Sequence, residues 1–405
     1  MEKIKSFLNN QKSQMIELQR ILTAIPAISP ENGGIGESEK CAALEKWLKE
    51  NGFSDIQKFS APDSRVPSKE RPSLVVTIPG QKDDYRIWVM AHMDVVPTGE
   101  LSLWETEPFT MVEKDGKLFG RGVEDNQQGL VSSVFASLYY VKNNITPLHT
   151  IKLLFVADEE CGSEYGIVYL MKNFDLFKKT DCVVIPDGGD PKGETIEIAE
   201  KNLLWLKLHV MGKQTHGSRP DSGNNACLAA NDLSLRLNKL ESFFNKKDDL
   251  FQPNYSTFQP TLRQKNVDSI NIIPGDDVFC MDCRILPCYS LKEVIAKVEE
   301  VCKEIEKDYG VKVEYTIPQK SESPATSQDA QIVKKLSQAI YKTRGINAKT
   351  IGIGGGTVGA ELRREGIEAA VWSTLEDMAH QPNEYCVIQN MIDDAITLAV
   401  LFNEE

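Results

Sequence analysis

Short apolar segments alternate with longer helical segments along most of the chain, and this alternation limits the fold more than any other feature. Each apolar segment is short enough for one strand, and the intervening stretches Gly129–Lys142 and Glu164–Asn173 have helical spacing. The pattern predicts an α/β sheet with covering helices. The predicted strands are Leu74–Ile78, Ile87–Ala91, Ile151–Ala157, Cys182–Pro186 and Ala369–Ser373.

The middle of the chain departs from this pattern. Its segments follow the order β-α-β-β-α-β, which is typical of a compact α+β sandwich of the ferredoxin-like type. Pro318–Ser327 is polar and is predicted to be a linker back to the first pattern. We therefore expect an inserted domain at residues 202–319, which splits the larger α/β domain into residues 1–201 and 320–405. The six segments are Leu203–Met211, Asn225–Leu240, Ser256–Leu262, Asp277–Arg284, Leu291–Tyr309 and Lys312–Ile317.

Composition narrows the class of protein. A chain of 405 residues is longer than one core usually serves, so two domains are expected. The formal net charge of −13 disfavours a nucleic-acid or anionic-membrane partner. The nine cysteines have no repeated spacing, and we find neither a signal core nor an apolar stretch of the ~20 residues that span a bilayer. We expect reduced thiols and a cytoplasmic protein.

Acidic and histidine side chains stand at or after the ends of four predicted strands. His92-Met93-Asp94 follows the second strand, Asp158-Glu159-Glu160 the third and Asp187 the fourth, and His380 lies in the loop after the fifth. Ligands gather at the carboxyl ends of strands in an open α/β sheet. Asp125, after a glycine-rich turn, can reach the same edge. Each feature alone is compatible with an ordinary turn or a solvated helix start, but together they predict a metal site.

The number of ligands indicates two metal ions. A dinuclear hydrolytic site needs one bridging carboxylate and two further ligands for each ion. Asp125 as the bridge, His92 with Asp187 on one ion, and Glu160 with His380 on the other meet this requirement. Imidazole and carboxylate ligands without cysteine favour zinc, with cobalt or manganese as alternatives.

Two neighbouring carboxylates are predicted to assist these ligands. Asp94 lies two residues after His92, on the same face of a strand, and could accept the other ring N–H of that histidine. Glu159 precedes a ligand but points differently, so it is free to take a proton from a metal-bound water and pass it to the leaving nitrogen.

These residues, in this order, resemble the M20 family of metallopeptidases and amidohydrolases, and the resemblance covers essentially the whole chain. It implies an α/β/α catalytic domain with a mixed sheet, interrupted by an α+β domain that serves as a lid and in dimerisation. It also implies the roles given above for Asp125, Glu159 and Asp94. The matching segments are Met90–Pro97, Trp104–Phe109, Gly120–Asp125, Asp158–Glu160, Asp187 and His380.

The inserted domain also carries residues that match the family. The segment Thr215–Ala226 resembles its H-x-x-x-P-x-x-G-x-N-A pattern, which implies that His216 reaches the scissile carbonyl, often from the partner subunit of a homodimer. Asn271 and Arg284 resemble its substrate clamp, because an arginine fork suits a free carboxylate. Without the resemblance, His216 and Arg284 would be interpreted as ordinary surface residues.

A glycine-rich loop, Gly354–Thr357, follows the short strand Lys349–Ile353. Alone it suggests a phosphate cradle, but it lacks the spacing of a dinucleotide fingerprint. The resemblance instead makes it a substrate-lining loop, in which the N–H groups of Gly355 and Gly356 could hold a carboxylate.

The sequence departs from the family pattern in two places, and one of them bears on substrate choice. Gln127 and Gln128 stand where lysine and glycine are common, which leaves the geometry of the Asp125 loop open. Asp187 stands where many deacylases have glutamate, and this favours a dipeptidase acting on a small substrate with a free carboxylate.

Three alternatives stay open. An N-acyl-amino-acid deacylase of the desuccinylase or deacetylase type is the nearest, because the motifs do not define the amine side of the substrate. A non-catalytic binding protein on the same fold is less compatible with a full set of ligands. A dinucleotide-dependent oxidoreductase is disfavoured by the missing fingerprint.

Overall fold

The computed structural model describes residues 1–404, which divide into two compact units. Unit 1 contains Met1–Ile198, Thr326–Thr350 and the chain from Glu361 on, and unit 2 contains Ala199–Ala325 and Ile351–Ala360. The insert expected at residues 202–319 lies inside unit 2, which is longer at both ends. Ile351–Ala360, which we expected in the larger domain, groups with unit 2 instead.

Unit 1 is built on an eight-stranded mixed sheet in the order β1-β2-β6-β3-β7-β16-β8-β15. β6, β3, β7 and β16 pair in parallel, whereas β1, β2 and β8 pair antiparallel with their neighbours. The four parallel strands therefore present their carboxyl ends at one edge. The strands are β1 Asp55–Pro62, β2 Glu70–Ile78, β3 Lys82–His92, β6 His149–Val156, β7 Cys182–Gly189, β8 Thr195–Glu200, β15 Lys349–Ile353 and β16 Glu368–Ser373.

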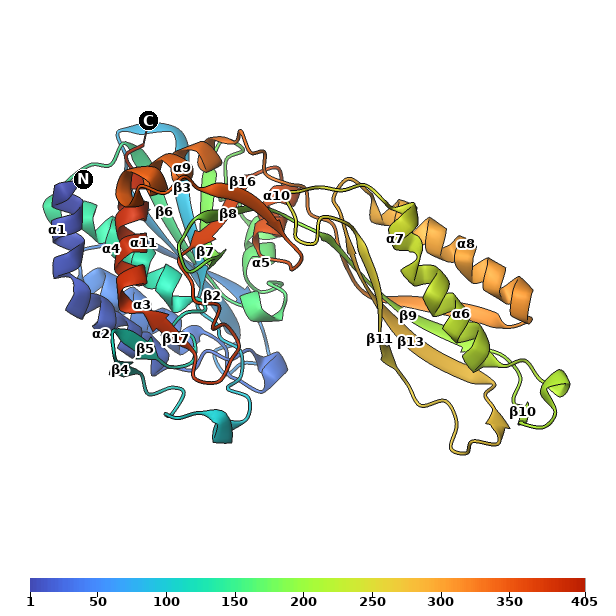
Figure 1. The fold of residues 1–405 in the computed structure, drawn as a ribbon. Coiled ribbons are helices and arrows are strands. Elements are labelled where there is room, and N and C mark those ends of the chain that lie inside the picture. The colour runs from blue at the N-terminus through green and yellow to red at the C-terminus, as the bar shows by residue number, and fades with distance from the viewer. Residues whose placement is uncertain (405) are drawn as a thin grey trace. The chain divides into compact units, whose positions relative to one another are not determined.

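Helices cover this sheet (Figure 1), which confirms the predicted α/β class. The central helix α4 is buried along most of its length and packs against β3, β6 and β7 on one side and against α11 on the other. A small sheet, β17-β5-β4, lies apart from the main one. The elements are α1 Glu2–Asn10, α2 Lys12–Thr23, α3 Ser38–Glu50, α4 Gln127–Asn143, α5 Ile167–Asn173, α9 Gln331–Arg344, α10 Gly359–Arg364, α11 Ile388–Leu401, β4 Val112–Lys114, β5 Lys117–Phe119 and β17 Tyr385–Val387.

Unit 2 is an antiparallel sheet in the order β11-β13-β9-β14 with helices on one face. This is the strand order of a ferredoxin-like β-α-β-β-α-β sandwich. Along β9 the side chains alternate between buried and more exposed, as expected for a sheet with one covered face. The elements are β9 Asn202–Met211, β10 Thr215–His216, α6 Ala226–Asn238, α7 Leu240–Phe243, β11 Thr257–Arg263, β12 Ile272–Ile273, β13 Asp276–Ile285, α8 Leu291–Tyr309 and β14 Lys312–Ser321.

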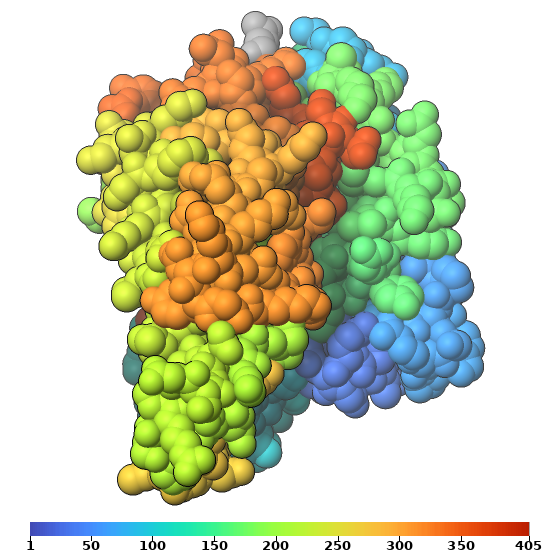
Figure 2. All heavy atoms as spheres, turned by 90° about the vertical axis from the view of Figure 1, so that its right-hand side faces the viewer, coloured from blue at the N-terminus to red at the C-terminus, as the bar shows by residue number. Residues whose placement is uncertain are grey.

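The orange chain of α8 and the lime-coloured chain near β10 lie at the surface of unit 2 (Figure 2). Ser290 begins α8 with a capping box that includes Glu293, as its sequence favours. The helix has the predicted bounds, Leu291–Tyr309.

Several predicted boundaries differ from the structure, among them the starts of β2 and β3, which are Glu70 and Lys82 rather than Leu74 and Ile87. The linker expected at Pro318–Ser327 is wrong in its first part, because β14 continues through Pro318 to Ser321. β14 is an edge strand, where a residue without an N–H is tolerated. The helix expected at Asn225–Leu240 is divided at Lys239 into α6 and α7, and α5 begins three residues later than predicted. Within residues 1–404, no helix is long and apolar enough to cross a membrane.

Candidate metal centre and active site

The predicted metal ligands of unit 1 come together at the carboxyl edge of its sheet. His92 is the last residue of β3, Glu160 lies in the 3-10 turn Glu159–Cys161 after β6, and Asp187 lies near the end of β7. Asp125 immediately precedes the entry to α4, and His380 follows β16. The parallel strands therefore deliver these groups to one place, as the sequence predicted.

Asp125 faces both histidines. Its Oδ1 lies 2.9 Å from Nε2 of His92, and its Oδ2 lies 3.2 Å from Nε2 of His380. Nε2 of His92 also lies 3.6 Å from Oδ1 of Asp187, and Nε2 of His380 lies 3.0 Å from Oε2 of Glu160. Each oxygen of Asp125 thus belongs to a different histidine–carboxylate pair, which is the arrangement expected of a bridging ligand.

The donor set fits divalent cations. His92, Asp125 and Glu160 can bring one ligand atom each within 4.8 Å of one another, and so can His92, Glu159 and Asp187. Oε1 of Glu160 is buried and accepts no hydrogen bond within residues 1–404. Nitrogen and oxygen donors without sulfur suit zinc, cobalt or manganese.

Burial makes the negative charges of this site costly. It raises the pKa of Glu159 well above its ordinary value, and it also raises the pKa values of Glu160 and Asp187. Burial opposes ionisation of Asp125 as well, but hydrogen bonds from His380 and His92 hold its pKa below the usual range. Bound cations would compensate the remaining charge.

Asp94 contacts the site differently from the sequence prediction. Nδ1 of His92 lies 3.0 Å from the backbone carbonyl of Asp94 and 3.5 Å from its carboxylate, so the carbonyl is the closer acceptor. The carboxylate instead accepts hydrogen bonds from the backbone N–H groups of Glu159 and Glu160, both at 3.0 Å. Asp94 therefore holds the turn that carries the proposed base and one proposed ligand.

Glu384 supports the Asp125 loop, and sequence analysis missed it. Its buried carboxylate accepts hydrogen bonds from the backbone N–H groups of Gly122, Glu124 and Asp125 at 2.9–3.1 Å, and from the Arg121 side chain at 2.7 Å. No local pattern marks Glu384, because the loop that it holds is about 260 residues away in the chain.

Glu124 supports the His380 loop in the same way. It accepts hydrogen bonds from the backbone N–H groups of Glu376 at 2.7 Å and Met378 at 2.5 Å, and burial raises its pKa to about 7. Glu124 lies inside the matching Gly120–Asp125 segment, so the motif pointed to it without indicating its role.

Gln127 and Gln128, which stand where the family commonly has lysine and glycine, make hydrogen bonds to other elements of unit 1. The hydroxyl of Thr23 donates to Oε1 of Gln127 at 3.0 Å. Nε2 of Gln128 donates to the carbonyl of Thr374 at 2.8 Å and to Asp394 at 3.2 Å. Both side chains therefore tie the start of α4 to other elements of unit 1 and leave Asp125 facing the histidines.

In unit 2, the structure brings His216 and Asn271 to one corner. β10 pairs with β12, so that His216 lies opposite Ile272, and the N–H of Gly217 donates to the carbonyl of Asn271 at 2.7 Å. The Asn271 side-chain oxygen accepts a hydrogen bond from Ser269 at 2.7 Å. These two predicted residues are therefore neighbours.

Arg284 lies beside the glycine-rich loop rather than projecting freely. It donates to both carboxylate oxygens of Asp282, at 2.8 and 3.0 Å, and to the carbonyl of Gly354 at 2.8 Å. Space surrounds Gly355, where an added Cβ would meet nothing within 4 Å, and at Gly356 the nearest atom would be 3.9 Å away. The loop thus has open positions next to a fixed arginine.

A cavity of about 180 Å³ opens beside Asp125 and Asp187 in unit 1. Carboxylate side chains dominate its lining, and no Lys, Arg or His is among the described residues that form it. The lining residues are Glu124, Asp125, Asp187, Gly188, Gly189, Glu197, Leu375, Asp377 and Ala379. The cavity is suited to a cationic group.

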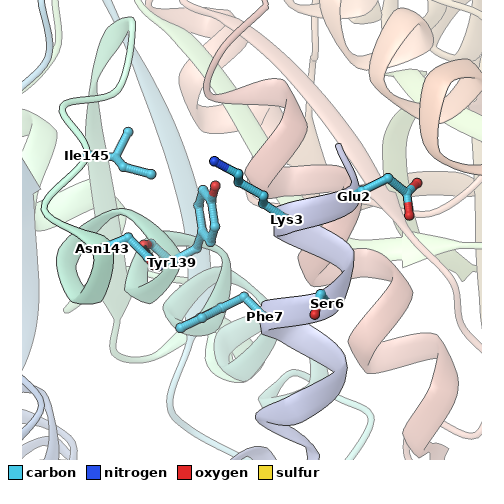
Figure 3. A pocket seen from close by; sticks show the side chains of 7 residues that line it. All are labelled: Glu2, Lys3, Ser6, Phe7, Tyr139, Asn143 and Ile145. Carbon is cyan, nitrogen blue, oxygen red and sulfur yellow. Dashed lines mark hydrogen bonds between the residues drawn. The ribbon is translucent and has the colours of Figure 1, made fainter.

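A larger hollow, of about 610 Å³, lies between α1 and α4 (Figure 3). Phe7 and Tyr139 meet edge to face there, with ring centroids 5.5 Å apart. Tyr139 is near the end of α4, whereas Asp125 precedes its start, and a helix of 17 residues spans about 25 Å. This hollow is therefore separate from the ligand cluster.

We expect Asp94→Ala to weaken metal binding by about 10–100-fold, because removing a residue that orients ligands typically has that effect. A calorimetric titration of the protein with zinc measures the affinity. Asp181→Asn is the control, because this buried carboxylate binds Arg86 and Trp88 at the other end of β7. Wild-type affinity in Asp94→Ala would contradict the role given to its carboxylate.

Comparisons with known proteins agree with this geometry. The model of the peptidase family M20/M25/M40 matches residues 88–404. An uncharacterized metallohydrolase of Methanocaldococcus jannaschii is 40% identical over 407 residues, covering 96% of this chain and 98% of its own. A succinyl-diaminopimelate desuccinylase of Rickettsia bellii is 26% identical over 383 residues, covering 91% of each. The aminopeptidase PepT of Bacillus cereus has the same fold, with a TM-score of 0.76 and 19% identity over 97% of this chain and 98% of its own.

Proposed function

Because the chain belongs to the peptidase family M20/M25/M40 and is a metallohydrolase, we propose that it cleaves an amide bond in a small substrate with a free carboxylate, as a dipeptidase-like exopeptidase. The position of Asp125 between His92 and His380 carries the hydrolytic part of this proposal. A dinuclear centre is the arrangement that uses both oxygens of Asp125.

We propose that His92, Asp187 and Asp125 hold one ion and that Glu160, His380 and Asp125 hold the other, with zinc as the preferred metal. Bound there, two such ions supply Lewis acidity and lower the pKa of a coordinated water. The residues of the chain provide the remaining functions, namely positioning and proton transfer.

Glu159 is the proposed general base. It lies within the same cluster as His92 and Asp187, and Asp94 fixes its backbone N–H. A carboxylate in this place can take a proton from water and pass it to the nitrogen of the leaving amine. His216 is the proposed donor to the oxyanion that forms on the scissile carbonyl.

Glu159→Gln should keep about two metal ions per chain and lose ~10²-fold or more in kcat, because the amide cannot accept the proton. Elemental analysis and steady-state kinetics measure the two effects. Glu164→Gln, an exposed residue just after the same turn, should resemble wild type. Near-normal turnover of Glu159→Gln would show that Glu159 is not the base. If the wild type holds only about one ion per chain, and Asp125→Ala still holds it, the centre is not dinuclear.

The acidic cavity favours a substrate with a free amino group. A dipeptidase must bind an ammonium group next to the scissile bond. Asp125 and Asp187 in the lining of the 180 Å³ cavity are proposed metal ligands, so Glu197 and Asp377 of the same lining are proposed to bind that charge. A desuccinylase must instead accept a second carboxylate, for which the described lining offers no cationic side chain. The deacylase alternative is kept because succinyl-diaminopimelate desuccinylases are 26–27% identical to the chain.

N-acetylation of a good dipeptide substrate should lower kcat/KM by at least about tenfold, because it removes the positive charge that the cavity is proposed to bind. Free dipeptides and N-acyl amino acids, including N-succinyl forms, are compared with zinc, cobalt and manganese supplied separately. Equal or better cleavage of the acylated series would favour the deacylase.

The free carboxylate of the substrate is proposed to bind at Arg284, Asn271 and the N–H groups of Gly355 and Gly356. Three of the five N–H groups of Arg284 donate to Asp282 and Gly354, so two remain for the substrate carboxylate. The contact with Asp282 fixes the plane of the guanidinium group before substrate binds.

Unit 2 is also proposed to form a homodimer. Leu228 and Leu235 are seven residues apart on α6, hence on one face, and are 55% and 60% exposed. Leu262, on the neighbouring edge strand β11, is 55% exposed. Together they form an apolar surface beside a strand edge that a second copy can cover.

Leu235→Glu should convert a dimer to a monomer, because it buries a charge in the proposed interface. Analytical ultracentrifugation measures the mass. The matched control is Tyr341→Glu, at a position on α9 of unit 1 that is 57% exposed. If the wild type is a monomer, or if Leu235→Glu remains a dimer, the proposed interface is wrong.

A further inference from the structure

His216 is the exposed second residue of the short strand β10, whose place in unit 2 is labelled in Figure 1. Its carbonyl accepts a hydrogen bond from the N–H of Arg219 at 2.8 Å, and Gly217 contacts the Asn271 backbone so closely that an added Cβ would lie 3.1 Å from the Asn271 carbonyl oxygen. The backbone around the histidine is thus held on both sides.

Ser218 contacts the imidazole of His216 through two groups. The backbone N–H of Ser218 lies 3.2 Å from Nδ1, and its hydroxyl oxygen lies 2.8 Å from the same atom. A backbone N–H can only donate, so Nδ1 must be an acceptor. The hydroxyl group, which rotates freely, then donates to Nδ1 as well.

A neutral imidazole carries one proton. When Nδ1 accepts, that proton must be on Nε2. Nε2 takes part in no hydrogen bond within the described part of the chain, so its N–H is available to a ligand.

We propose that Ser218 is a positioning residue that fixes His216 as the neutral imidazole protonated at Nε2. This inference rests on the proposed function, because the acceptor for that N–H is the oxyanion of an amide hydrolase. It makes His216 a hydrogen-bond donor that cannot act as a base through Nε2, and it leaves the role of base to Glu159.

The tautomer can be measured without a substrate. The protein is labelled with ¹⁵N-histidine, and two-bond ¹H–¹⁵N correlation spectra, which distinguish the two neutral tautomers, are recorded at alkaline pH. The chain has five histidines, and His216→Gln identifies the signal of interest. Wild type should show a protonated Nε2 and an unprotonated Nδ1; a dominant Nδ1–H form would overturn the proposal.

Two serine variants test the cause. Ser218→Ala should lower the tautomer ratio by about fivefold, the contribution of one ordinary hydrogen bond, and Ser218→Thr should restore it. Ser222→Ala is the control, because this exposed serine of the same turn makes no side-chain contact with His216 among the described residues. An unchanged ratio in Ser218→Ala would overturn the proposal.

Kinetics then separate this inference from the function on which it rests. Ser218→Ala should lower kcat in proportion to the measured fraction of His216 that is protonated at Nε2, with little change in KM, because the donor acts on the transition state. A kcat that does not follow this measured fraction would overturn the positioning role. If neither dipeptides nor N-acyl amino acids are cleaved, the proposed function is wrong. The spectra still show which tautomer His216 adopts.

Discussion

Crowding of negative charge at the carboxyl edge of one sheet is the constraint on which unit 1 depends. Four parallel strands and one loop bring Asp125, Glu159, Glu160 and Asp187 together with only two imidazoles between them. Like charges in a buried place repel each other and lose hydration. The fold must therefore hold these groups by other means.

A second layer of carboxylates provides that support. Asp94, Glu124 and Glu384 each accept hydrogen bonds from backbone N–H groups of a loop that carries a proposed ligand or the proposed base. Hydrogen bonds from backbone N–H groups to a carboxylate are charge-assisted and stronger than neutral ones, so two or three of them can orient a loop. Asp94 links the end of β3 to the turn after β6, and Glu124 and Glu384 link the Asp125 loop to the loop after β16.

The sequence was sufficient for the parts of this arrangement that follow from local patterns. Apolar runs predicted all five central strands, and their ends predicted where His92 and Asp187 would meet. It was insufficient where an outcome depends on distant contacts. Glu384 has no local signal, and Pro318 looked like a linker because the edge position of β14 is visible only in the assembled sheet.

The chain passes between the two units four times, and this has a consequence for protein engineering. The chain leaves unit 1 after Ile198, returns at Thr326, leaves again after Thr350 and returns at Glu361. Unit 2 thus consists of two segments of the chain. The shorter segment places the glycine-rich loop beside Arg284. Replacing residues 199–325 alone would transfer Arg284 without the glycine-rich loop beside it. An exchange of substrate specificity between relatives therefore requires that residues 199–325 and 351–360 be replaced together.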